Sequence, residues 1–120
     1  MKEAVRRVEK PWGFELIFAH TDRYVGKLLH IEPGQALSLQ FHNHKDETFF
    51  VANGEIELQV EENGNLVRHP LRQGESYRVQ PGTRHRMVAT AAGCELFEVS
   101  TPELDDVVRL EDRYGRSSNG

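Results

Sequence analysis

The sequence predicts an all-β domain, an antiparallel sandwich or small barrel, and three observations support this fold class. The chain has 120 residues, enough for one hydrophobic core but too few for two domains. Apolar and polar residues alternate over many short runs, as they do in half-buried strands. Glycine and proline, with 10 and 5 copies, fall mainly between these runs and mark turns. Short strands at regular spacing with turns between them are typical of sandwiches and barrels.

The predicted strands follow one another along most of the chain. The clearest is 55–61, where Ile56, Leu58 and Val60 share one face and charged or amide side chains take the other. The segment 62–65 contains a glycine and joins this strand to the next as a hairpin. The expected strands cover residues 14–18, 24–31, 36–42, 48–52, 55–61, 66–71, 76–79, 86–90 and 95–99.

One segment near the C-terminus favours a short helix. Thr101 and Pro102 suit the N-cap and the first helical position, and Leu104, Val107 and Val108 recur at helical spacing. The same residues also fit an extended tail that packs on the barrel, so both interpretations stay open. We expect a single domain over residues 1–120, with a core over roughly 11–100 and a tail over 101–120.

Composition and charge argue against several classes of protein. The net charge is -4, with 15 Lys and Arg against 19 Asp and Glu, which does not suit a nucleic-acid partner. No apolar run reaches the length of a membrane span, and the first residues lack the apolar segment of a signal peptide. Cys94 is the single cysteine and cannot form an internal disulfide. We therefore expect a cytoplasmic protein with no membrane partner.

Two windows of the sequence contain histidines at ligand-like spacing. In the first, His42 and His44 lie on one predicted strand and point to the same face. Glu47 follows after a short break, where its carboxylate can turn into the same space. In the second window, a Pro-Gly turn leads into a strand that opens with His85. Such a set suits a divalent ion such as zinc, manganese, iron or nickel, although polar residues on solvated strands would look the same.

These residues resemble the two motifs of the cupin family. The first motif is a glycine, then His-x-His, then a glutamate and a second glycine, and it is matched by Gly34, His42, His44, Glu47 and Gly54. The second motif runs Gly-x5-Pro-x-Gly-x2-His, and residues 74–85 match it except that Gln80 stands where the family usually has proline. The resemblance implies a small double-sheet barrel, or jelly roll, that holds one divalent metal ion through His42, His44, Glu47 and His85.

The segments that flank the motifs indicate which subfamily of cupins the sequence resembles. Residues 11–13, 37–40 and 105–116 are similar to the cupin domain of type II mannose-6-phosphate isomerases, which is often fused behind a mannose-1-phosphate guanylyltransferase. The sequence departs from that pattern at Lys45 and Thr48, where the family has arginine and histidine. The resemblance implies a metal-dependent sugar-phosphate isomerase. The alternatives are a metal-dependent oxygenase and a non-enzymatic cupin that binds a sugar or another small molecule.

An isomerase needs a base for proton transfer and cations for the phosphate. Glu98 is the expected base, because alternation along its strand can turn it to the barrel interior, although an exposed strand carboxylate fits the same pattern. Arg109 is the expected phosphate ligand, with Arg116 or Lys27 as further candidates, unless the tail is simply held by salt bridges. We expect a small-molecule substrate such as a sugar phosphate, and a homodimer that covers an open sheet edge. The expected pocket-lining residues are Gln40, Phe49, Tyr77 and Met87.

Overall fold

The computed structural model describes residues 1–116, and residues 117–120 of the predicted tail lie outside this description. The described residues form nine antiparallel strands and no helix, which confirms the predicted fold class. In this part of the chain no helix is long and apolar enough to cross a membrane. The strands are β1 Arg6–Lys10, β2 Gly13–His20, β3 Val25–Ile31, β4 Leu39–Phe41, β5 Glu47–Glu62, β6 Asn65–Arg72, β7 Ser76–Val79, β8 His85–Ser100 and β9 Val108–Glu111.

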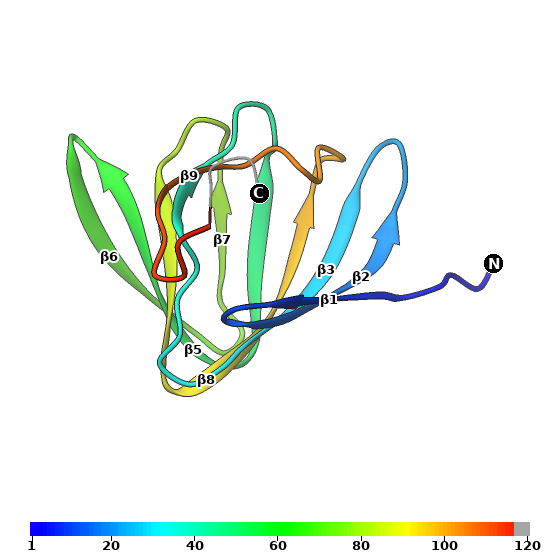
Figure 1. Cartoon of the computed structure of the whole chain (residues 1–120), viewed down its shortest axis with the longest axis horizontal. Coiled ribbons are helices and arrows are strands. Elements are labelled where there is room, and N and C mark those ends of the chain that lie inside the picture. Colours follow the sequence, from blue (N-terminus) through cyan, green and yellow to red (C-terminus); the bar gives the residue numbers. More distant parts are fainter. Residues whose placement is uncertain (117–120) are drawn as a thin grey trace.

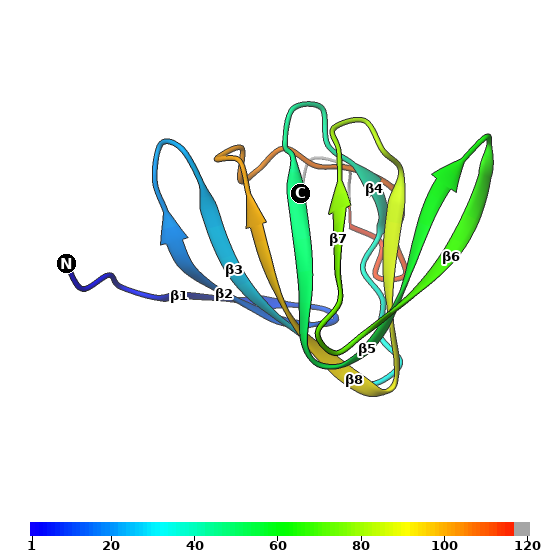
Figure 2. The same ribbon diagram turned by 180° about the vertical axis from the view of Figure 1, so that it is seen from behind.

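Two long strands, β5 and β8, each take part in two curved layers. Residues 47–53 of β5 pair with 95–100 of β8, and this layer continues through β3, β2 and β1 on one side and β7 on the other. Residues 56–60 of β5 pair with 85–89 of β8, and this layer continues through β6 on one side and β4 and β9 on the other. Figure 1 and the reverse view in Figure 2 show the two layers curling around a common interior.

Glycine stands where these two strands bend from one layer into the other. Gly54 of β5 pairs with Cys94 of β8, and the register shifts on both sides of it. Gly54 has a φ of +82°, and a Cβ there would lie 2.4 Å from the carbonyl oxygen of Gly93. Only glycine fits this close approach of two backbones. The bend lets one pair of strands build both walls of the interior.

The hairpin predicted after residue 61 is confirmed. Strands β5 and β6 pair from Glu55↔Arg72 to Glu62↔Asn65. The two residues between them, Asn63 and Gly64, have φ values of 52° and 81°. Two successive positive φ angles are those of a type I′ turn, whose twist matches that of the flanking strands.

The structure joins strands that the sequence analysis separates. The expected strands 48–52 and 55–61 are parts of β5, and 86–90 and 95–99 are parts of β8. Bulges bend these strands without ending their pairing, so the glycines mark a corner rather than a loop.

The helix expected near the C-terminus is wrong, and the extended alternative is the one observed. After Thr101 the chain makes turns up to Val107 and then continues as β9 beside β4. A helix of this length is marginal by itself, whereas the edge of β4 offers partners for the backbone. The strand expected over 36–42 is shorter than predicted, because only Leu39–Phe41 forms β4, and Ala36 makes an isolated bridge with Val88.

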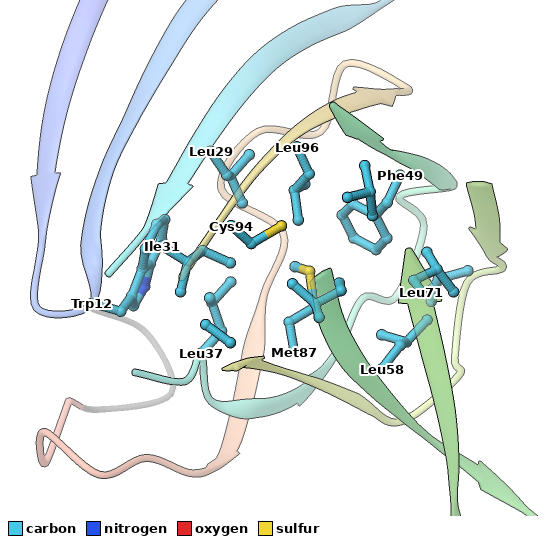
Figure 3. Packing of buried hydrophobic residues seen from close by; sticks show 14 of the residues in the cluster. Trp12, Leu29, Ile31, Leu37, Phe49, Leu58, Leu71, Met87, Cys94 and Leu96 are labelled. Atoms are coloured by element: carbon cyan, nitrogen blue, oxygen red, sulfur yellow. The ribbon is translucent and has the colours of Figure 1, made fainter. Parts of the chain in front are cut away.

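The hydrophobic core fills the space between the two layers. Trp12 packs against residues from β3 at one side, and Phe49 lies at the other, as Figure 3 shows. The ring of Phe49 also approaches His85, with 6.4 Å between the ring centroids. At this point the apolar core gives way to buried polar side chains. The labelled core residues in Figure 3 are Trp12, Leu29, Ile31, Leu37, Phe49, Leu58, Leu71, Met87, Cys94 and Leu96.

Candidate metal centre

Three buried side chains from separate segments converge beside the core. Glu47 begins β5, His85 begins β8, and His42 follows directly after β4. Nε2 of His42 and Nε2 of His85 each lie 3.2 Å from Oε1 of Glu47. Ligand atoms of the three residues lie within 4.8 Å of one another. The exposed fractions of 3%, 2% and 1% for His42, Glu47 and His85 show that this group is shielded from water.

Backbone carbonyls fix which nitrogen of each imidazole faces Glu47. Nδ1 of His42 lies 2.5 Å from the carbonyl oxygen of Asp106, and Nδ1 of His85 lies 2.9 Å from that of Thr83. A carbonyl oxygen only accepts, so Nδ1 carries a hydrogen in both rings. In the neutral rings, two Nε2 lone pairs then face a carboxylate oxygen. Three converging atoms that each present a lone pair repel one another unless a cation lies between them. Two imidazoles oriented by carbonyl oxygens and one carboxylate are a ligand set that fits a divalent metal ion.

Lys45 and Glu98 extend the group into a buried charge network. Nζ of Lys45 lies 2.9 Å from Oε2 of Glu47 and 3.0 Å from Oε2 of Glu98. Burial disfavours the ammonium, but the carboxylates of Glu98 and Glu47 outweigh it and raise the pKa of Lys45. Burial also acts to raise the pKa of Glu47, but its contacts with the imidazoles of His42 and His85 and the charge of Lys45 hold the pKa well below its usual value. Lys45 and Glu47 therefore both stay charged near neutral pH.

Asp106, just before β9, holds the loop between β4 and β5 in place. Its carboxylate accepts hydrogen bonds from the backbone amides of Asn43, His44 and Lys45 at 3.0, 2.7 and 3.0 Å. Burial acts to raise the pKa of Asp106, but the three amides outweigh it and lower the pKa to about 2. Because its own carbonyl oxygen also orients His42, this one residue positions both the loop and a candidate ligand.

The structure places His44 outside the buried group. Strand β4 ends at Phe41, and the chain bends at Asn43 and His44. Alternation of side chains between two faces holds only while the strand continues. The side chain of His44 is exposed, and its amide is bound to Asp106. Three of the four expected metal ligands are brought together, and His44 is not.

A cavity of about 510 Å³ adjoins the group, and its wall is rich in basic side chains. Burial, opposed by Glu15, lowers the pKa of Lys10, and the charges of Lys27, Arg109 and Arg116 lower it further. Lys27 also has an ion pair with Glu15 at 3.4 Å. Mutual repulsion among cations in a partly closed cavity favours a bound anion.

Most of the other expected site residues line this cavity. Glu98 is buried there, rather than exposed on the outside of its strand. Tyr77 instead packs near His69 of β6, with ring centroids 5.3 Å apart. The expected residues that line the cavity are Gln40, Phe49, Met87, Glu98, Arg109, Arg116 and Lys27.

Sequence reasoning does not single out Lys45, Asp106 or Lys10. Lys45 stands between two expected ligands, and its only signal is that it keeps the positive charge of the arginine found in the resembling family. Asp106 belongs to the closing segment that carries the resemblance, but its role depends on how the tail folds back. Lys10 precedes the Pro-Trp-Gly segment and reaches the cavity through β1.

Comparison with known proteins gives sequence matches over most of the chain. A model of the cupin domain matches residues 27–100. The chain is 34% identical over 116 residues to the xanthan biosynthesis protein XanB of Xanthomonas campestris, covering 93% of this chain and 24% of that protein. It is 35% identical over 115 residues to a mannose-1-phosphate guanylyltransferase of Escherichia coli, covering 92% and 23%. The chain thus spans about a quarter of the length of these relatives.

Solved structures share the architecture at lower sequence identity. KdgF from Halomonas sp. superposes with a TM-score of 0.72 at 21% identity, covering 86% of this chain and 89% of that chain. Oxalate decarboxylase from Bacillus subtilis superposes with a TM-score of 0.76 at 16% identity, covering 88% and 30%. At these identities the likeness concerns the fold alone.

Proposed function

The chain belongs to the cupin domain family, and from this premise we propose that it is a metal-dependent sugar-phosphate isomerase of the mannose-6-phosphate isomerase type. One divalent ion, zinc, manganese, iron or nickel, would be held by His42, Glu47 and His85. The observation that carries the proposal is the convergence of three buried acceptor atoms on one point beside a cavity with a basic wall. The bound ion would act as a Lewis acid toward the carbonyl and hydroxyl oxygens of the sugar.

Glu98 is the proposed base of the reaction. It is buried and lines the cavity, where a carboxylate can take a proton from C2 of an open-chain aldose. The C2–H bond breaks and its electron pair forms the C1–C2 double bond of an enediolate, while the electrons of the C1 carbonyl π bond move to O1. The same carboxyl then returns the proton to C1, and the proton of the C2 hydroxyl passes to O1 as the C2 carbonyl forms. The ammonium of Lys45, 3.0 Å from Glu98, compensates negative charge in this dry space.

The phosphate of the substrate is proposed to lie against the basic wall of the cavity. Arg109 and Arg116 come from the C-terminal segment, and Lys10 comes from β1. Guanidinium groups bind phosphate with two hydrogen bonds, and an ammonium adds charge. The name of the guanylyltransferase relative, which includes a mannose phosphate, supports this class of substrate.

Binding without turnover is the second candidate function, and one observation favours it. Glu98 is tied to the ammonium of Lys45, so it must loosen that ion pair before it can accept a proton. A protein that only binds a sugar phosphate would need no such rearrangement.

An isomerase assay separates the two candidates. Mannose 6-phosphate is incubated with the protein and each of the four metals in turn, and fructose 6-phosphate is followed. We expect turnover with at least one metal and a loss of about 100-fold or more in Glu98→Gln. Glu95→Gln is the matched control, because Glu95 lies on the same strand and is paired with His30 at the surface, so it should keep the activity. Calorimetric binding of mannose 6-phosphate with no turnover under any metal would favour the binding candidate and overturn the isomerase.

We also propose that the protein forms a homodimer. Phe50 of β5 pairs directly with Phe97 of β8 on the outer face, and Phe18 meets Phe97 edge to face at 6.1 Å. These side chains are exposed, together with Val99, and a cluster of this kind favours association. Light scattering at micromolar concentration should give twice the chain mass, and a monomeric mass would overturn the proposal.

A further inference from the structure

We propose that the carboxylate of Glu15 stands where the phosphoryl group of the substrate binds, so that the two anions compete for the ammonium groups of Lys10 and Lys27. The inference rests on the proposed function, which supplies the identity of the anion. It adds an acidic residue that weakens the hold of the cavity on phosphate. Glu15 thereby favours release of the product, which carries the same group.

Strand pairing turns Glu15 and Lys27 to the interior of the fold. Glu15 of β2 is the direct partner of Leu29 on β3, and Lys27 lies two positions before Leu29. Directly opposed residues of antiparallel strands share a face, and so do residues two positions apart on one strand. Glu15 and Lys27 line the cavity with exposed fractions of 8% and 7%. A carboxylate and an ammonium thus meet in a wall from which most water is excluded.

The ion pairs of Glu15 are longer than those beside the candidate metal centre. Oε2 of Glu15 lies 3.4 Å from Nζ of Lys27, and Oε1 lies 3.9 Å from Nζ of Lys10. By comparison, Nζ of Lys45 lies 2.9 and 3.0 Å from its two carboxylate partners, close to the usual length of about 2.7–2.9 Å for charge-assisted hydrogen bonds. An anion that approaches both lysines at this usual length can therefore outcompete Glu15.

Positive charge exceeds negative charge around the cavity. Among the described residues that line it, six are Lys or Arg and four are Asp or Glu. Two of these acids pair with Lys45 beside the candidate metal centre, so the surplus lies among the other cations. Burial lowers the pKa of Lys10, and the charges of three other cations of the wall lower it further, although Glu15 opposes this. A phosphoryl group carries a charge of about −1.5 to −2 near neutral pH, so it relieves the repulsion better than one carboxylate does.

Glu15 is easier to displace than the carboxylate that holds Arg116. Asp112 accepts hydrogen bonds from the backbone amide, Nε and Nη2 of Arg116 at 2.8, 3.0 and 2.9 Å. Three short bonds fix that guanidinium at the cavity. Glu15 contacts two ammonium groups on flexible stems, and each stem can turn toward an incoming anion.

Titration calorimetry with inorganic phosphate tests the competition on the full chain without added metal. Glu15→Gln keeps the shape of the side chain but removes its charge, and should tighten phosphate binding by about tenfold. Asp105→Asn is the matched control, because Asp105 lines the same cavity but is exposed to solvent. Its affinity for phosphate should stay within about threefold of the wild type. Unchanged or weaker binding in Glu15→Gln, or an equal gain in Asp105→Asn, would overturn the proposal.

A double-mutant cycle with Lys27→Met separates direct competition from a general effect of charge. Lys27→Met should weaken phosphate binding, and in that background Glu15→Gln should gain less than in the wild type, because one of the two contested ammonium groups is gone. The same gain in both backgrounds would contradict competition for Lys27. Thermal unfolding shows whether each variant is folded, and Glu15→Ala replaces Glu15→Gln in the cycle if the latter is not.

Mannose 6-phosphate is the second probe, and Glu15→Gln should tighten its binding by the same factor as that of inorganic phosphate. A gain with inorganic phosphate alone would overturn the assignment of this position to the phosphoryl group of the substrate. The isomerase assay is a separate readout: a chain without turnover, in which Glu15→Gln tightens both ligands, would overturn the isomerase and leave the competition standing. Failure of the wild type and Glu15→Gln to bind either ligand would overturn the inference itself.

Discussion

At the scale of single residues, the site depends on matched charges in a dry environment. Glu47 receives two imidazoles on one oxygen and the ammonium of Lys45 on the other. Each partner offsets part of the cost of burying the carboxylate. This balance explains why removing any one member should cost more than an exposed ion pair would.

Lys45→Met tests this balance against a nearby exposed pair. The substitution leaves Glu47 and Glu98 without their ammonium and should lower the free energy of unfolding by about 3–5 kcal/mol. Arg78→Met is the control, because it removes an exposed ion pair with Asp46 at 2.6 Å and should cost less than about 1 kcal/mol. Urea unfolding of the metal-free proteins measures both. Equal losses would contradict the larger contribution of the buried Lys45 network to stability.

The lowered pKa of Asp106 predicts how the stability of the protein depends on pH. Its pKa is lowered from 3.8 to about 2, so its contribution is present in full above about pH 4 and is lost as the pH falls toward 2. Asp106→Asn should cost about 2 kcal/mol at neutral pH, because hydrogen bonds to a charged acceptor are lost. The difference between wild type and variant in free energy of unfolding should shrink from pH 4 to pH 2. A difference that stays constant over this range would rule out the carboxylate as its source.

Single residues also show where sequence reasoning succeeds and where it stops. His42, Glu47 and His85 can be predicted because their motif spacing places them at strand ends. The place of His44 depends on strand β4 ending at Phe41, and local alternation does not reveal that end. The partners of Lys45 are set by the fold rather than by the sequence around it.

At the scale of elements, the alternation of apolar and polar residues predicts most strands. Pairing with other strands of the fold decides at which residue each strand begins and ends. The hairpin at Asn63–Gly64 follows from local sequence, because positive φ angles select these residue types. Strand β9 could not be predicted, because its partner β4 lies far away in the sequence. The bend at Gly54, where β5 and β8 stay paired, is interpreted as a loop from the sequence for the same reason, because that pairing joins segments that are distant in the sequence.

Two glycines with similar backbone angles separate the effect of φ from that of crowding. Gly54 and Gly64 have φ of +82° and +81°, but only Gly54 would bring a Cβ within 2.4 Å of another backbone atom, the carbonyl oxygen of Gly93. Gly64→Ala should cost about 1–2 kcal/mol from its φ alone. Gly54→Ala should cost clearly more, because the corner of β5 must move as well. Equal shifts in urea unfolding would contradict the close approach at that corner.

At the scale of the whole molecule, the candidate centre lies where three parts of the fold meet. The start of β5 supplies Glu47, the start of β8 supplies His85, and the C-terminal segment orients His42 through Asp106. The cavity beside the centre is lined by residues from both ends of the chain. The three candidate ligands that converge could be predicted from motifs, but the cavity wall could not, because only folding brings its residues together.

Uptake of a divalent ion by the EDTA-treated wild-type chain, measured by elemental analysis after dialysis, tests the metal centre most directly. We expect one bound ion per chain in the wild type and almost none in His85→Ala, with His69→Ala, which alters a histidine on β6, retaining the ion. A wild type that takes up no ion, or a His85→Ala variant that takes up as much as the wild type, would show that these buried side chains are not a metal site.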